Sequence, residues 1–159
     1  MSFVVFLDVD GVLNTRTTVE QSLDGHTGID DARVEILAKA IQKMGGADIV
    51  LSSDWKNISD KAKDLDYLAS KLSKYGLKIS DQTSDKWHYR GEGIQAYLDA
   101  HPEVKEYVIL DDNTFDFEDF PRLWERLLLT YGIERARFAS DTPAVEAMIF
   151  LEDIRHFSL

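Results

Sequence analysis

Polar side chains able to do chemistry stand at the ends of predicted strands or at the start of a predicted helix. Seven of them are carboxylates, hydroxyls or a cation: Asp8, Asp10, Ser52, Ser53, Arg90, Asp111 and Asp112. Acids after a strand are often only turn formers or helix caps, and that interpretation suffices for one Asp-x-Asp pair. A second pair of acids favours a metal, because clustered carboxylates repel one another and a hard cation such as Mg²⁺ relieves the repulsion. These residues therefore predict a metal site.

The elements that must position these residues follow from hydrophobic periodicity. Continuous apolar runs predict buried strands, and apolar residues spaced by three and four predict amphipathic helices. The predicted strands are 3–7, 49–51, 77–79 and 107–110. The predicted helices are 31–44 with Asp30 as its N-cap, 65–75, one between Gly91 and Pro102, and one capped by Thr142 with Pro143 at its first position. Residues 120–131 fit a helix, although 127–130 also fit a strand.

Alternating strands and helices predict the fold class. We expect an α/β fold that is doubly wound and Rossmann-like, with a mainly parallel sheet and helices on both faces. No repeat or linker divides the sequence, so residues 1–159 are interpreted as a single domain. Sites in such sheets form at the carboxyl ends of the strands, which is where the polar residues stand.

The amino-acid composition and net charge exclude several classes of function. The 159 residues include 18 Lys plus Arg and 29 Asp plus Glu, a formal net charge of −11, and no Cys. That charge argues against binding of long nucleic acid, which needs a basic surface. The lack of Cys excludes disulfides, thiolate nucleophiles and cysteine-ligated metal sites. No apolar run is long enough to span a membrane and no signal-peptide pattern precedes the first strand, so we expect a cytoplasmic protein.

Four ordered motifs resemble those of the haloacid dehalogenase (HAD) superfamily of phosphotransferases. The first is Asp8-Val9-Asp10-Gly11-Val12-Leu13-Asn14, followed by Ser52, by Arg90 before Gly-Glu-Gly-Ile, and by Ile109-Leu110-Asp111-Asp112. The resemblance covers roughly residues 3 to 116. The sequence around Arg90 and Asp111 is also similar to that of small phosphatase-like domains found in RNA-repair proteins.

The resemblance implies roles for the catalytic residues. Asp8 would attack phosphorus and form an aspartyl-phosphate, and Asp10 would protonate the leaving oxygen and later deprotonate water. Ser52 would donate to a phosphoryl oxygen, with Ser53 as the competing hydroxyl. Arg90 would neutralise another phosphoryl oxygen, with Lys86 as the competing cation.

The resemblance also implies the metal ligands and the remaining substrate contacts. Mg²⁺ would be held by the Asp8 carboxylate, the main-chain carbonyl of Asp10 and Asp111, with Asp112 as a direct or more distant ligand. Gly11 suits a turn with unusual backbone angles, and it is expected to contribute to substrate binding.

A Mg²⁺-dependent phosphatase acting on a phosphate monoester is the function that these roles imply. The alternatives are a metal-dependent nuclease, which would not need Asp8 as a covalent nucleophile, and a non-catalytic interaction module on a HAD-like fold. Residues 15–30 are long enough for a flap but not for a domain, so no large cap is expected. Nucleotides, sugar phosphates, phosphoproteins and a phosphorylated polynucleotide end all remain possible substrates, and no membrane partner is expected.

The other polar and aromatic residues are assigned ordinary structural roles. His26, His88, His101 and His156 lack ligand spacing, and Trp55 and Trp87 are expected in the core. Asp116 and Asp119 are expected to cap the next helix, although Asp116 is also near enough to the acidic motif to be a ligand. The remaining set is predicted to form a solvated helix face: Lys61, Lys63, Asp64 and Asp66.

Overall fold

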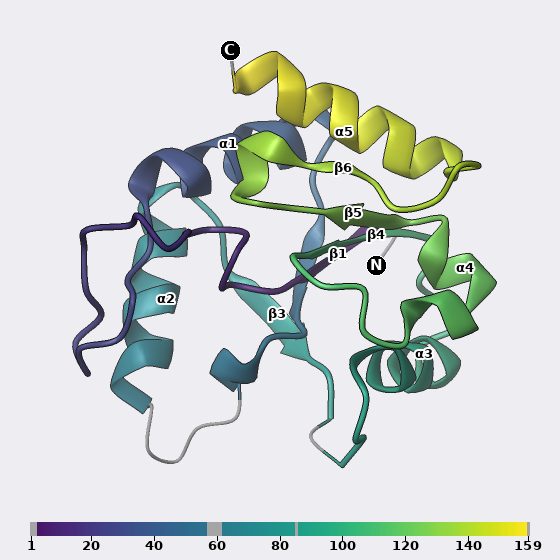
Figure 1. Cartoon of the computed structure of the whole chain (residues 1–159), viewed down its shortest axis with the longest axis horizontal. Coiled ribbons are helices and arrows are strands. Elements are labelled where there is room, and N and C mark those ends of the chain that lie inside the picture. The colour runs from purple at the N-terminus through teal and green to yellow at the C-terminus, as the bar shows by residue number, and fades with distance from the viewer. Residues whose placement is uncertain (1–2, 57–61, 85, 159) are drawn as a thin grey trace.

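A six-stranded sheet in the order β3-β2-β1-β4-β5-β6 forms the centre of the computed structural model, which describes residues 3–56, 62–84 and 86–158 (Figure 1). The strands are β1 Phe3–Leu7, β2 Asp48–Leu51, β3 Ile79–Gln82, β4 Glu106–Asp111, β5 Leu127–Leu129 and β6 Arg137–Phe138. All neighbouring pairs are parallel except β5 and β6, which are antiparallel. The predicted α/β class with a mainly parallel sheet is confirmed.

Helices cover both faces of the sheet. They are α1 Asp31–Lys43, α2 Ala62–Lys74, α3 Arg90–Ala100, α4 Pro121–Trp124 and α5 Val145–Phe157, with short 3₁₀ turns η1 Asp54–Lys56, η2 Phe117–Asp119 and η3 Ile133–Arg135. Because side chains alternate along a strand, Val5 and Leu7 of β1 pack with α1, α2 and α5, whereas Val4 and Phe6 pack with α3 and α4. The continuous apolar run of β1 is therefore buried from two sides.

The ends of the central strands lie level at one edge of the sheet. Beyond β1, the backbone N–H of Asp8 donates to the carbonyl of Leu110 at 3.0 Å, and the N–H of Ser52 donates to the carbonyl of Leu7 at 2.9 Å. Parallel pairing thus brings the residues after β1, β2 and β4 to the same edge.

The segment between β1 and α1 contains a small hairpin, the 20–28 hairpin, with an antiparallel bridge between Gln21 and Thr27. In the part of the chain that the structure describes, the segments after β1 and β2 hold only this hairpin, α1, η1 and α2, so no large cap is present there. Among the described residues, no helix is long and apolar enough to cross a membrane.

Several predicted boundaries differ from the structure: the helix expected at 65–75 is Ala62–Lys74, and two further differences have a local cause. The strand expected at 77–79 begins only at Ile79, because Leu77 instead donates its N–H to Leu72 at 2.9 Å and closes the end of α2. The last helix begins at Val145 with Ala144 as N-cap, because Thr142 takes part in a local turn in which its N–H donates to Ser140 Oγ at 3.0 Å.

The ambiguous segment 120–131 contains both of the elements considered for it. Residues Pro121–Trp124 form α4, and Leu127–Leu129 form β5 beside β4. Asp30 does occupy the N-cap position of α1, but its carboxylate makes no cap hydrogen bond; it contacts Arg33 and Thr18 instead.

Candidate active site

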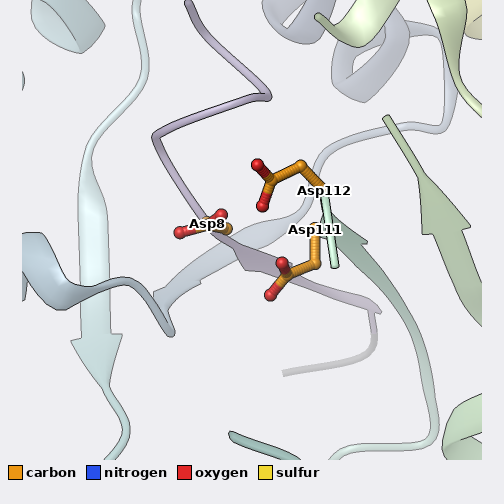
Figure 2. A group of neighbouring side chains, drawn as sticks. All are labelled: Asp8, Asp111 and Asp112. Atoms are coloured by element: carbon orange, nitrogen blue, oxygen red, sulfur yellow. The ribbon is translucent and has the colours of Figure 1, made fainter. Parts of the chain in front are cut away.

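Three carboxylates converge where β1 and β4 end (Figure 2). Asp8 is the residue after β1, Asp111 is the last residue of β4, and Asp112 follows it. One oxygen from each lies within 4.8 Å of the others. Asp8 is 5% exposed and Asp111 is 0% exposed, whereas Asp112 faces solvent. The structure thus brings together three of the four acids predicted as metal ligands.

The guanidinium of Arg90 lies against this cluster. Its Nη1 is 2.7 Å from Asp111 Oδ2 and 3.4 Å from Asp8 Oδ1, and its Nη2 is 3.6 Å from Oδ1 of the exposed Asp54. The competing cation, Lys86, instead lies over the ring of Trp87 with its Nζ 4.9 Å from the centroid. Arg90 is therefore the cation that reaches the carboxylates.

Asp116 fixes the start of the helix that carries Arg90. The backbone N–H groups of Gly91 and Glu92 donate to the Asp116 carboxylate at 2.6 and 3.0 Å. A Cβ on Gly91 would lie 2.8 Å from Asp116 Oδ1, so the approach requires glycine. Asp116 does occupy the N-cap position of η2, as predicted, but its carboxylate makes no cap bond there and binds the exposed N–H groups of α3 instead; Asp119 is the last residue of η2.

Burial and mutual repulsion alter the acidity of the cluster. Burial raises the pKa of Asp8 well above its ordinary value; Asp111 and Asp112 add to the rise, while Arg90 and Ser53 oppose it. Burial likewise raises the pKa of Asp111 to about 7, although Arg90 and the N–H of Asn113 oppose the change.

The same crowding makes this group of oxygens suitable for a cation. Arg90 carries one positive charge and faces carboxylates that cannot all ionise comfortably beside it. A hard divalent cation with a preference for oxygen ligands would favour their ionised forms. The donor set therefore fits Mg²⁺.

The two serines after β2 are both buried but differ in their contacts. Ser53 hydrogen-bonds Asp8, and its Oγ also accepts from the N–H of Trp55 at 3.2 Å. Ser52 is 0% exposed, and within the described residues its Oγ has no hydrogen-bond partner. A buried hydroxyl without a partner is costly, and a bound oxygen ligand would satisfy it.

The Asp10 carboxylate is not part of the three-acid cluster. Its Oδ1 accepts hydrogen bonds from Asn14 Nδ2 at 3.0 Å and from Trp55 Nε1 at 3.2 Å, and the residue is exposed. Its expected role as a metal ligand concerns the main-chain carbonyl and stays a prediction. Sequence reasoning missed Asn14 and Trp55, although Asn14 lies only four residues from Asp10 in the same motif.

Gly11 makes the turn that separates Asp10 from the cluster. Its φ is +82°, and a Cβ there would lie 2.3 Å from Asp112 Oδ2. Its N–H donates to Asn14 Oδ1 at 3.0 Å, and its carbonyl accepts from the N–H of Gly132 at 2.8 Å. The predicted unusual backbone conformation is confirmed, and its contribution to substrate binding stays a prediction.

Other predicted roles have mixed outcomes. Trp55 is buried as expected, whereas Trp87 is 38% exposed and outside the core. Asp64 was expected on a solvated helix face, which is wrong: it is buried and accepts from the backbone N–H of Asp24 at 3.3 Å. Lys61 lies outside the described residues.

Comparison with known proteins identifies one family. The family model described as the HAD domain in Swiss Army Knife RNA repair proteins matches residues 4–136, well over half of the chain. The match includes every element that carries a residue of the site. A search of curated proteins found no match.

Proposed function

Because the chain belongs to the family of HAD domains found in Swiss Army Knife RNA repair proteins, we propose that it is a Mg²⁺-dependent phosphatase. The family supports a hydrolase of the phosphatase type. The finer proposal is hydrolysis of a phosphate monoester through an aspartyl-phosphate on Asp8. The observation that carries it is the convergence of Asp8, the Ser52 hydroxyl and the Arg90 guanidinium at one edge of the sheet, where Ser52 Oγ has no hydrogen-bond partner among the described residues.

In the first step, an Asp8 oxygen attacks phosphorus while the bond between phosphorus and the substrate oxygen breaks. Asp10 gives its proton to the departing oxygen. In the second step, water attacks the phosphoryl group, Asp10 takes the proton of that water, and the bond to Asp8 breaks to release inorganic phosphate. The nucleophile and the acid return to their starting states.

Asp10 is prepared for this exchange by its neighbours. Asn14 and Trp55 both donate to Oδ1, which leaves Oδ2 without a partner among the described residues. The two hydrogen bonds fix the plane of the carboxyl group, so one oxygen is held and the other is available to the substrate. Asn14 and Trp55 are thus positioning residues.

Asp8, Asp111, Asp112 and the main-chain carbonyl of Asp10 would hold the metal ion. Mg²⁺ bound there supplies positive charge that favours ionised Asp8 and stabilises the phosphoryl group during transfer. Ser52, Ser53 and Arg90 would donate to the phosphoryl oxygens, and the backbone at Gly11 allows close approach of the substrate.

A phosphorylated end of an RNA is the substrate that the family description favours. The net charge of −11 opposes binding along an extended nucleic acid, but it does not oppose capture of one terminal phosphate by Arg90 and a metal ion. The cytoplasmic location expected from the sequence stays a prediction.

A phosphate-release screen over phosphorylated metabolites and oligonucleotides with 5′ or 3′ phosphate ends tests this function. The proposal expects Mg²⁺-dependent release that EDTA abolishes and that Asp8→Asn reduces by at least about a thousandfold. Cleavage of internal phosphodiester bonds that survives Asp8→Asn would instead support a metal-dependent nuclease. A folded, Mg²⁺-binding protein without activity on any of these esters would support a non-catalytic module.

A further inference from the structure

A cavity of about 790 Å³ opens beside Asp10, and Asp112 of the carboxylate cluster also lines it. Its walls come from the residues after β1, from the 20–28 hairpin, from Trp55 and from Asp64 at the start of α2. If Asp10 protonates the leaving oxygen, the rest of the substrate must lie on this side. The residues that line this cavity therefore contact the part of the substrate beyond its terminal phosphate.

His26 stands on that wall in a fixed orientation. Its Nδ1 is 2.7 Å from Oδ2 of Asp64, a carboxylate that is only 1% exposed. Burial opposes ionisation of Asp64, but hydrogen bonds from Ser22, His26 and Asp24 hold the pKa of its carboxyl below the ordinary value. An ionised carboxylate can only accept, so Nδ1 carries the proton. In the described ranges Nε2 makes no hydrogen bond or ion pair, and the side chain is 53% exposed.

Polar side chains on one face of α2 bind the segment that carries His26 through hydrogen bonds and an ion pair. Asp64, Tyr67 and Lys71 are spaced by three and four residues and so share a helix face. Asp64 accepts from the backbone N–H of Asp24, Tyr67 Oη accepts from the N–H of Ile29 at 3.0 Å, and Lys71 Nζ is 2.7 Å from Glu20 Oε2. The ring of His26 is therefore held in position before any ligand arrives.

Arg16 lines the same cavity and is exposed. Within residues 3–56, 62–84 and 86–158 no carboxylate forms an ion pair with it. Arg16 and His26 are the basic residues among those that line the cavity, in a chain whose net charge is −11; Asp64 lies against His26, and Asp10 and Asp112 also line the wall. Within the described residues Arg16 has no ion pair and Nε2 of His26 has no hydrogen bond, so both can meet a second anionic group of a ligand in this cavity.

We propose that Arg16 and His26 bind a second phosphate group of the substrate, next to the monoester that Asp8 attacks. The inference rests on the proposed function for the placement of the first phosphate. With Nδ1 of His26 held by Asp64, Nε2 is the ring atom that hydrogen-bonds the second phosphate, and Arg16 adds a forked donor that suits phosphate oxygens. The second phosphate is either the phosphodiester that continues a nucleotide chain or the second group of a small bisphosphate.

His26→Asn and Arg16→Gln test this assignment. The Asn amide can still donate to Asp64 in place of Nδ1 but has no group at the position of Nε2, so the hairpin contact is kept while the phosphate contact is lost. The substrates are p-nitrophenyl phosphate, adenosine 3′,5′-bisphosphate and a diadenylate with a 3′ phosphate. Each substitution is expected to raise KM about tenfold more for a substrate with a second phosphate than for p-nitrophenyl phosphate, with kcat changed far less.

The pattern across substrates identifies the source of the second phosphate. A selective rise for the diadenylate alone supports a phosphodiester, and one for the bisphosphate alone supports a small molecule. An equal rise for all three substrates would overturn the assignment, since it would indicate a general disturbance of the site. His156→Asn, the same substitution on α5 and away from the cavity, is expected to leave all three KM values unchanged.

A binding measurement separates this inference from the proposed function. In Asp8→Asn protein, calorimetry with adenosine 3′,5′-bisphosphate reports affinity without turnover. Adding His26→Asn is expected to weaken binding about tenfold for the bisphosphate or, in the same measurement, for the diadenylate with a 3′ phosphate, and unchanged affinity for both ligands would contradict the second-phosphate site. Failure of the wild-type protein to hydrolyse any of the three esters would count against the proposed function instead.

Discussion

Asp111→Asn is expected to change how the metal-free protein responds to pH. Burial raises the pKa of the Asp111 carboxyl from 3.8 to about 7. Because the folded state holds this proton more tightly than the unfolded chain, the free energy of unfolding falls as pH rises between those two values. One pKa unit corresponds to about 1.4 kcal/mol, so over this pH interval the free energy of unfolding falls by on the order of 4 kcal/mol.

Asparagine removes the titration but keeps an oxygen that can accept from Arg90. The contribution of Asp111 is fully present below about pH 4 and is lost by about pH 7. Relative to wild type, Asp111→Asn is therefore expected to gain up to a few kcal/mol of stability over this range. Denaturant unfolding in EDTA at a series of pH values measures the difference. The matched control is Asp141→Asn, which also removes one carboxylate but at an exposed position before α5.

The second half of the experiment measures how much Mg²⁺ stabilises each of the two proteins. At about pH 8 wild type is expected to gain about 2.7 kcal/mol of stability when Mg²⁺ is in hundredfold excess over its Kd, by mass action. Asp111→Asn should gain much less, because it has lost a predicted ligand. A difference between the two proteins in EDTA that stays flat or shrinks as pH rises would show that Asp111 does not hold its proton more tightly in the folded state.

Three further substitutions test other parts of the site. Asp116→Ala removes the acceptor for the first N–H groups of α3 and is expected to cost about 1 kcal/mol in denaturant unfolding, with weaker phosphate binding through the displaced helix start. Trp55→Phe keeps the aromatic packing but removes a donor to Asp10, so kcat is expected to fall about tenfold with little change in KM, and an unchanged kcat would argue against a positioning role. Gly11→Ala places a Cβ 2.3 Å from Asp112 Oδ2 at a φ of +82°. It is expected to lower the free energy of unfolding by roughly 1–3 kcal/mol and to weaken Mg²⁺ binding in calorimetry. A variant as stable as wild type would contradict that steric argument.

The parts of the fold that follow a local rule could be predicted from the sequence. The run Phe3–Leu7 shows a strand buried on both faces, and acids directly after strands show where the site must form. The convergence of Asp8 with Asp111 and Asp112 follows from parallel pairing of β1 with β4, because that pairing places their ends side by side.

The features that the sequence did not predict depend on partners far away in the chain. Asp64 looks like a solvated helix residue by its own neighbours, and only folding brings His26 against it across 38 positions. Asp116 accepts from the N–H of Gly91 at the start of α3 across 25 positions, and Trp55 reaches Asp10 across 45 positions. Side-chain hydrogen bonds over such separations leave no periodic pattern, so element prediction cannot find them.

The covalent role of Asp8 is the central claim, and rapid-quench mass spectrometry tests it most directly. Wild-type protein mixed with Mg²⁺ and a hydrolysable monoester, quenched in acid within one turnover and digested, should carry one phosphoryl group on the peptide that contains Asp8. Hydroxylamine should remove that group, as expected for an acyl-phosphate, and Asp8→Asn should show neither the adduct nor phosphate release. Steady turnover without any adduct, or turnover that persists in Asp8→Asn, would contradict the account.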